Sequence, residues 1–184
     1  MTAMAVLLAP GANGPRDHRT LVAIEAAMEE AAPGTVVERI ELGGRAGPKV
    51  VAAVRSAAAA LAKRADVPPD RVALGGRSFG GRMCSMAVAE GLPALGLVLV
   101  SYPLHAPGRP DQLRAGHFVE IGVPCLFVSG TRDAFATPAE LEAATATIPG
   151  PVTHAWMEGG GHGLRGCDSE VASVVSRWVV GLRG

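Results

Sequence analysis

The sequence has few cysteines and no excess of charge of either sign. Its 184 residues include three cysteines, Cys84, Cys125 and Cys167, with no Cys-x-x-Cys pair and no histidine beside them at zinc-ligand spacing. Neither a disulfide framework nor a structural zinc site is therefore expected. The 17 Lys and Arg residues balance the 17 Asp and Glu residues. Binding to nucleic acid or anionic lipid calls for a basic face, so neither partner is expected.

Long hydrophobic runs are also missing. No window approaches the ~18 consecutive apolar residues that a transmembrane helix needs. The short apolar run Met4–Ala9 lacks a positively charged leader and a small-residue cleavage site, which favours a strand over a signal peptide. We therefore expect a cytoplasmic protein without membrane contact. The length suits one domain over residues 1–184.

Glycine is abundant, and short apolar runs alternate with alanine-rich or amphipathic stretches that are long enough for helices. Residues 97–100, Leu-Val-Leu-Val, are apolar at every position, which is typical of a parallel strand covered on both faces. The alternation predicts a three-layer α/β fold, with a six-stranded, mostly parallel sheet between helices. The predicted strands are Ala5–Ala9, Val36–Leu42, Val72–Gly75, Leu95–Ser101, Cys125–Ser129 and Thr153–Met157, and the predicted helices are Leu21–Ala32, Val50–Ala65, Met83–Glu90, Pro138–Thr147 and Ser169–Leu182.

A Gly-x-Ser-x-Gly pattern follows the third run. Gly76, Ser78 and Gly80 lie between a predicted strand and a predicted helix, which is the setting of a nucleophile elbow. Such a turn projects the serine hydroxyl beyond the carboxyl ends of the strands, where open parallel sheets bind ligands. By itself the pattern also fits a phosphate-binding loop or a plain glycine-rich turn.

Two partners for this serine occur further along the chain. Asp133 follows the run that ends at Ser129, and His162 lies in a glycine-rich turn after the last run. Alone, each has a simple structural explanation, as a turn former or an exposed histidine. In the order Ser, Asp, His they predict a triad in which His162 takes the Ser78 proton and Asp133 orients the imidazole.

These residues and their surroundings resemble the α/β-hydrolase superfamily. The segments 75–83, 101–105, 124–133 and 161–162 are similar to a small, lidless, dienelactone-hydrolase-related family, which includes testis-expressed 30 and the NSL complex regulatory subunit 3 type. The resemblance implies a minimal sheet without the first hairpin of the generic fold. Residues 103–123 leave no room for a helical lid, which argues against a lipase that shields a long acyl chain.

In this fold two backbone N–H groups form the oxyanion hole, and Ala12 and Phe79 fill their places here. The family usually has His-Gly before the first of these donors, whereas this sequence has Pro10-Gly11. The backbone donor is kept, although a histidine side chain is lost. An ordinary tight turn is the alternative explanation for residues 10–14.

Several further residues lie where they could contact a substrate. Arg77 could bind a carboxylate or phosphate, whereas Arg82 is expected to pair with a neighbouring acid. His105 could line the pocket or only hold the proline-rich loop after it. His18 lies at a helix start where Asp17 is the expected N-cap. The candidate substrate-binding residues are Asn13, His18, Arg77, Tyr102 and His105.

The sequence therefore predicts a serine hydrolase that cleaves a small carboxylic ester or thioester through an acyl-enzyme. No metal and no organic cofactor is needed for this chemistry. A non-catalytic scaffold and an acyltransferase using the same site are the alternatives, and fold-level analogy does not choose among ester, thioester, lactone and amide. A monomer is favoured over a homodimer.

Overall fold

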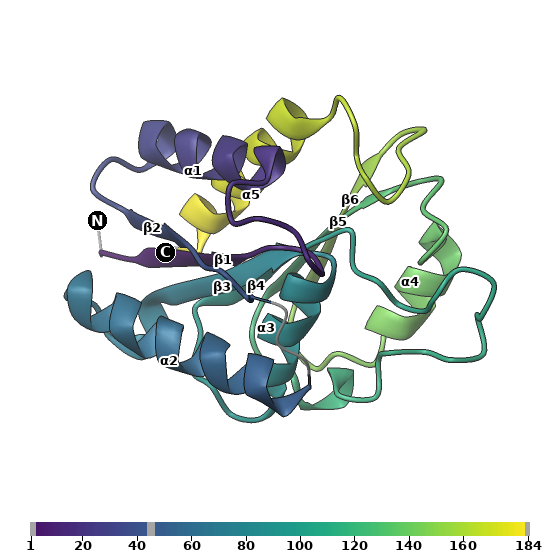
Figure 1. Ribbon diagram of the computed structural model, residues 1–184, viewed down its shortest axis with the longest axis horizontal. Helices are drawn as coiled ribbons and strands as arrows, with labels where there is room; N and C mark the ends of the chain where they lie inside the picture. The colour runs from purple at the N-terminus through teal and green to yellow at the C-terminus, as the bar shows by residue number, and fades with distance from the viewer. Residues whose placement is uncertain (1–2, 44–46, 183–184) are drawn as a thin grey trace.

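The fold is described from a computed structural model that covers residues 3–43 and 47–182 of the chain (Figure 1). Its six-stranded sheet has the order β2-β1-β3-β4-β5-β6, and every neighbouring pair is parallel. The strands are β1 (Ala5–Ala9), β2 (Val36–Arg39), β3 (Val72–Arg77), β4 (Gly96–Val100), β5 (Cys125–Gly130) and β6 (Val152–Met157), and the helices are α1 (Arg19–Ala31), α2 (Pro48–Arg64), α3 (Phe79–Ala89), α4 (Pro138–Thr145) and α5 (Asp168–Gly181).

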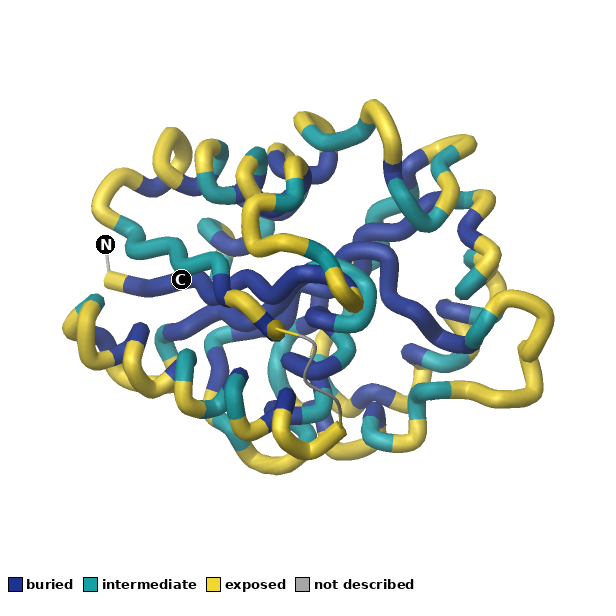
Figure 2. The backbone as a smooth tube through the Cα atoms, in the orientation of Figure 1, coloured by how far each residue is buried: buried dark blue, intermediate teal, exposed yellow. Residues whose placement is uncertain are grey.

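Helices cover both faces of the sheet, as Figure 1 shows, and the buried strands form the middle layer in Figure 2. Alternate side chains of β1 point to opposite faces. Leu7 joins the apolar layer under α2, α3 and α4, whereas Val6 and Leu8 join the layer under α1 and α5. The predicted three-layer fold with a six-stranded parallel sheet is therefore confirmed.

Most element boundaries differ from the prediction by one or two residues, and those of β2, β3 and α3 bear on the site. β2 ends at Arg39 instead of Leu42, since its pairing with β1 ends at the partners Leu8 and Arg39. β3 continues to Arg77. α3 begins at Phe79, since its glycines Gly80 and Gly81 are buried in the first helical turn.

The order in which the chain adds strands to the sheet reverses at β1. The chain passes from β1 to β2 on one side and then returns to β3 on the other side of β1. The loops after β1 and β3 therefore leave the sheet in opposite directions, which opens a crevice at the carboxyl ends of these strands. Residues 10–14 follow β1 at this crevice, and Ser78 follows β3 there.

The connection between β4 and β5 contains one short 3-10 helix, η2 (Phe118–Glu120), and no α-helix. A second 3-10 helix, η1 (Pro69–Arg71), precedes β3. None of the helices within residues 3–43 and 47–182 has the length and apolar character needed to cross a membrane.

Candidate active site

Ser78 occupies a strained turn between β3 and α3. Its φ is +49° and its ψ is −119°, a backbone conformation that is costly for a residue with a side chain. The Ser78 N–H donates to the carbonyl of Val100 at 2.8 Å, and the Ser78 carbonyl accepts from the N–H of Arg82 at 3.0 Å. These bonds hold the turn in place on both sides.

The two glycines of the motif allow this turn to lie against the end of β1. A Cβ atom on Gly76 would lie 2.0 Å from the carbonyl oxygen of Ala9. A Cβ atom on Gly80 would lie 2.3 Å from the carbonyl oxygen of Pro10. Both distances are far inside van der Waals contact, so the pattern Gly-x-Ser-x-Gly follows from the close approach of two backbones.

Three side chains from three strand ends meet at this turn. The Oγ of Ser78 lies 2.9 Å from Nε2 of His162. The Nδ1 of His162 lies 2.8 Å from Oδ2 and 3.0 Å from Oδ1 of Asp133. Because a carboxylate accepts at Nδ1, the neutral ring carries its proton there and presents the Nε2 lone pair to the Ser78 hydroxyl.

The side chains of Asp133 and His162 differ in how far they are buried. The Asp133 side chain is fully buried, and that of His162 is 19% exposed. Oδ1 of Asp133 also accepts from the backbone N–H of Phe135 at 2.8 Å, so the buried carboxylate has donors from two residues. The arrangement can remove a proton from Ser78 and stabilise the resulting imidazolium.

Phe135 belongs to this site, although no pattern in the sequence pointed to it. Its ring stacks on the imidazole of His162, with centroids 4.0 Å apart and planes inclined by 26°. Its position two residues after Asp133 lets its backbone bind the carboxylate while its ring covers the histidine. The signal in the sequence was only an aromatic residue near the predicted acid.

The N–H groups of Ala12 and Phe79 are free at the predicted oxyanion hole. Phe79 begins α3, so its N–H is one of the helix donors without an intrahelical acceptor. Within the described part of the chain, neither N–H has a hydrogen-bond acceptor. The turn that holds Ala12 is closed by a hydrogen bond of 3.0 Å from the Gly14 N–H to the Gly11 carbonyl.

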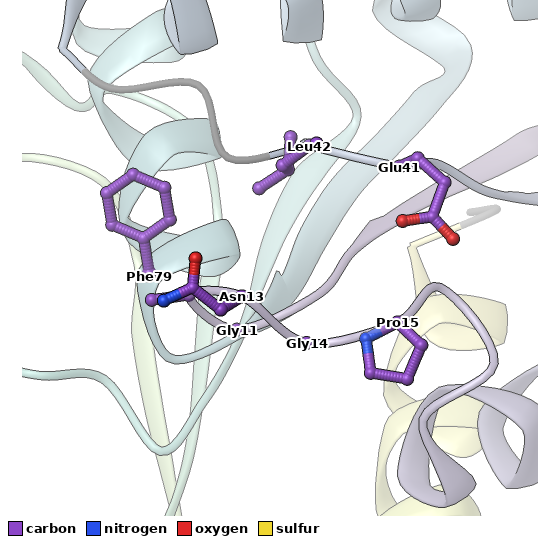
Figure 3. Close-up of a pocket in the computed structure, with 9 residues that line it drawn as sticks. Gly11, Asn13, Gly14, Pro15, Glu41, Leu42 and Phe79 are labelled. Carbon is purple, nitrogen blue, oxygen red and sulfur yellow. The ribbon is translucent and has the colours of Figure 1, made fainter.

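A cavity of about 470 Å³ lies at these two donors (Figure 3). Figure 3 shows Phe79 at one end of it, Pro15 at the other, and Leu42 and Glu41 across from the loop residue Asn13. The predicted contact residue Asn13 therefore lines this cavity. Its lining combines apolar surface with the Glu41 carboxylate, which accepts from the backbone N–H of Arg16.

His18 and Arg77 line a second cavity, of about 430 Å³. The Nη2 of Arg77 donates to the carbonyl of His162 at 3.0 Å, which ties this arginine to the triad. His18 is the N-cap of α1, with Nδ1 accepting from the Thr20 N–H at 3.3 Å. The expectation that Asp17 caps this helix is wrong, because the Asp17 carboxylate instead pairs with Arg39.

Tyr102 is buried in the core, so its prediction as a substrate contact is wrong. The residue is 1% exposed, its ring packs on Phe118 and Phe127, and its hydroxyl donates to the Arg114 carbonyl at 2.7 Å. Burial raises the pKa of Tyr102, so its hydroxyl stays protonated at neutral pH. Tyr102 is therefore part of the hydrophobic core.

His105 holds the proline-rich loop that follows it, which was the alternative to a place in the pocket lining. Its Nδ1 lies 2.9 Å from the Ala106 carbonyl, and its Nε2 lies 3.4 Å from the carboxylate of Glu140 on α4. The residue is 5% exposed. These contacts hold the proline-rich loop to α4 and leave no ring nitrogen for a substrate.

The prediction that Arg82 pairs with a neighbouring acid is wrong. Across the residues that the structure describes, no carboxylate lies within ion-pair distance of its guanidinium. Arg82 instead lies close enough to the Tyr102 phenol and to His117 to influence the pKa of each.

The three cysteines are free thiols. Cys84 and Cys125 are buried, and burial raises the pKa of each thiol to about 12, so both are unreactive core residues. In the ranges 3–43 and 47–182, no group of three or more His, Cys, Asp or Glu side chains is arranged to hold a metal ion.

A parallel sheet with a serine on a strained turn after its third strand, followed in the chain by Asp and His at later strand ends, has the architecture of the α/β-hydrolase class. The chain belongs to the family described as "Alpha/beta hydrolase domain", which matches residues 2–176.

Solved structures share this fold. Est1E from Butyrivibrio proteoclasticus aligns with a TM-score of 0.81 at 14% identity, over 98% of this chain and 88% of that chain. An alpha-beta serine hydrolase homologue from Coxiella burnetii aligns with a TM-score of 0.74 at 17% identity, over 96% and 85%. EstE1, a thermophilic carboxylesterase cloned from a metagenomic library, aligns with a TM-score of 0.67 at 17% identity, over 100% and 81%. At these identities the likeness concerns the fold.

Proposed function

We propose that this protein is a serine hydrolase that cleaves a small carboxylic ester or thioester, with Ser78 as nucleophile, His162 as base and Asp133 as the orienting acid. The observation that carries the proposal is the continuous hydrogen-bond chain of 2.9 Å from Ser78 to His162 and 2.8 Å from His162 to Asp133. A serine hydroxyl becomes a useful nucleophile only when such a base takes its proton.

The reaction begins as His162 Nε2 removes the Ser78 proton and Oγ attacks the carbonyl carbon. The carbonyl oxygen becomes an oxyanion, which accepts hydrogen bonds from the N–H groups of Ala12 and Phe79. The positive end of the α3 helix dipole also stabilises this oxyanion. His162 then gives its proton to the leaving oxygen or sulfur, and the acyl group remains on Ser78.

Water completes the cycle. His162 removes a proton from a water molecule, the hydroxide attacks the acyl-Ser78 carbonyl, and the carboxylic acid leaves as Ser78 regains its proton. These reaction steps need no metal or organic cofactor. The open cavity at Ala12 and Phe79 and a β4–β5 connection without an α-helix suit a small or partly exposed acyl group.

Within the superfamily, the finer assignment is to the small dienelactone-hydrolase-related group, supported by the elbow segment 75–83. Residues 1–184 would act as one domain, as a cytoplasmic monomer. An acyltransferase would use the same acyl-enzyme with an alcohol or amine in place of water. A non-catalytic scaffold would give no reason for the alignment of Ser78, His162 and Asp133.

Turnover of short-chain p-nitrophenyl esters and acyl thioesters tests the proposal. We expect the wild-type protein to release p-nitrophenol or thiol and the Ser78→Ala variant to lose this turnover, with both proteins folded by circular dichroism. Analysis of products with added alcohols or amines separates transfer from hydrolysis. Equal turnover by wild type and Ser78→Ala would contradict the proposal.

A further inference from the structure

A cationic cavity lies directly beside the triad. It is lined by His18, Arg19, Arg77, Gly163 and Arg165, which come from three separate segments of the chain. Arg77 immediately precedes Ser78, and Gly163 immediately follows His162. With the hydrogen bond from Arg77 to the His162 carbonyl, these neighbours place the cavity within reach of a substrate bound at Ser78.

The positive charge of this cavity is only partly balanced. Asp168 pairs with Arg19 at 3.0 Å and also accepts from the Thr20 hydroxyl at 2.6 Å. In residues 3–43 and 47–182, neither Arg77 nor Arg165 has a carboxylate within ion-pair distance. Two guanidinium groups are therefore available to an anion that enters the cavity.

Arg77 is held in place and is partly desolvated. One side of its guanidinium lies against Gly11, where an added Cβ would be 3.2 Å from Nη1. Its Nε is buried and has no hydrogen-bond acceptor. Burial, with the charge of Arg19, lowers the pKa of Arg77, and the more distant carboxylates of Asp133 and Asp168 only partly oppose this shift. A fixed, partly buried guanidinium that no carboxylate contacts directly is favourable to an anionic ligand, which would supply the missing partner.

His18 adds a neutral donor. Its Nδ1 accepts from the Thr20 N–H, so the proton of the neutral ring lies on Nε2. Burial lowers the pKa of His18, which keeps the ring neutral at pH 7. The first cavity is different, because it is lined by the Glu41 carboxylate and by Leu42 and Phe79, a surface for an uncharged part of a ligand.

We propose that the natural substrate of Ser78 carries a second, anionic group, a carboxylate or a phosphate, which binds to Arg77 and Arg165 in this cavity. The proposal rests on the proposed function and adds the substrate class. Arginine suits the role, because its planar fork donates two parallel hydrogen bonds to a carboxylate or phosphate. The substrate is then an ester or thioester with one acid group near the bond that is cleaved.

Matched substrates test this inference. In one pair the carboxylate is on the acyl part, as in p-nitrophenyl hemiglutarate against p-nitrophenyl valerate. In the second pair it is on the leaving group, as in 3-acetoxybenzoate against its methyl ester. We expect kcat/KM for the anionic member of at least one pair to exceed that of the neutral member by about tenfold or more.

Arg165→Gln is the informative variant. Among the residues that the structure describes, the Arg165 side chain has no hydrogen bond or ion pair with a triad residue, whereas Arg77 donates to the His162 carbonyl. In Arg165→Gln, the ratio of kcat/KM for the anionic substrate to kcat/KM for the neutral substrate should fall to near one. Arg71→Gln is the matched control, because Arg71 lies at the opposite end of β3 from Ser78. It should keep the wild-type preference. A preference that is absent in both pairs, or unchanged in Arg165→Gln, would overturn the inference and leave the hydrolase proposal standing.

Calorimetric titration with glutarate and with inorganic phosphate gives a readout that does not depend on turnover. We expect at least one of these anions to bind the wild-type protein, with binding at least about tenfold weaker in Arg165→Gln. Tighter binding of glutarate indicates a carboxylate, and tighter binding of phosphate indicates a phosphate. If no ester is cleaved, the hydrolase proposal fails, and the titration alone decides whether the cavity binds anions. Binding of neither anion overturns the inference.

Discussion

Phe135 stacks face to face on His162, with the ring centroids 4.0 Å apart. The same residue donates its backbone N–H to Asp133 at 2.8 Å. One residue therefore contacts both the imidazole and the carboxylate that orients it. The stack fixes the plane of the imidazole, and the Asp133 carboxylate at Nδ1 turns Nε2 toward Ser78.

Phe135→Leu should lower kcat without unfolding the protein. The backbone bond to Asp133 remains, but the aromatic contact is lost, which is worth about 0.5–1.5 kcal/mol and corresponds to a roughly two- to tenfold effect. Phe135→Tyr keeps a stacking ring and should stay near the wild-type kcat. Steady-state kinetics with a p-nitrophenyl ester measure both. A Phe135→Leu enzyme with wild-type kcat would show that the stack does not position His162.

Asp133→Asn should lower turnover steeply and retain the fold. An amide that donates toward Nδ1 favours the wrong imidazole tautomer, and the corresponding change in a serine protease triad costs about 10⁴-fold in kcat. Glu158→Gln is the matched control. Glu158 is exposed and accepts from the Thr131 hydroxyl at 3.3 Å. Equal losses in the two variants would contradict Asp133 as the orienting acid.

Gly76→Ala should destabilise the whole domain. The new methyl group would lie 2.0 Å from the Ala9 carbonyl oxygen, in a backbone with a φ of +153°. Overpacking and backbone strain together should cost about 3 kcal/mol or more and lower the Tm by roughly 10 °C. Gly122→Ala, where an added Cβ meets open space, should leave the Tm close to the wild-type value. Thermal unfolding compares the two, and equal Tm values would refute the tight contact of β1 with β3.

His117 should make the protein less stable in acid. Burial, with the nearby charge of Arg82, lowers the pKa of His117 to about 4. Ser85 Oγ donates to the Arg82 carbonyl at 2.8 Å and lies 2.8 Å from His117 Nε2, which therefore donates to Ser85. The unfolded chain binds the extra proton between pH 6.5 and 4, so stability is present above pH 6.5 and is lost as the pH falls toward 4.

Urea unfolding at pH 7 and pH 4.5 measures this loss for the wild type and for His117→Gln. The variant keeps an N–H donor for Ser85 but cannot titrate. We expect the wild type to lose about 2 kcal/mol more than the variant over this range, since partial exposure of the ring reduces the full effect. An equal loss in the two proteins would assign the acid sensitivity to other groups, such as His18 and His154, whose pKa values burial also lowers.

The sequence predicted the sheet well because its central strands β1, β4 and β5 are buried along their whole length. Runs such as residues 97–100 are apolar at every position, and each lies within a strand of the structure. The start of α3 was missed because Gly80 and Gly81 look like loop residues. Their buried contacts with Pro10 and Gly76 appear only when β1 and β3 lie side by side.

The site was predictable where chemistry restricts the residue type. Ser78, Asp133 and His162 were selected by their order and by the strand ends that they follow, and the structure brings them into hydrogen-bond contact. Phe135 was missed, because its contact with His162 joins residues that are distant in the chain. Arg165 was not selected either, because the sequence does not show that it shares a cavity with Arg77. Tyr102 follows a strand like the triad residues, but its ring turns into the core.

Labelling with a fluorophosphonate probe tests the central claim most directly. The probe reacts with an activated serine, so the folded wild-type protein should gain one adduct, located at Ser78 by mass spectrometry. Ser78→Ala should gain none. No adduct on the folded wild-type protein, or an adduct that persists in Ser78→Ala, would contradict the account of Ser78 as a nucleophile activated by His162.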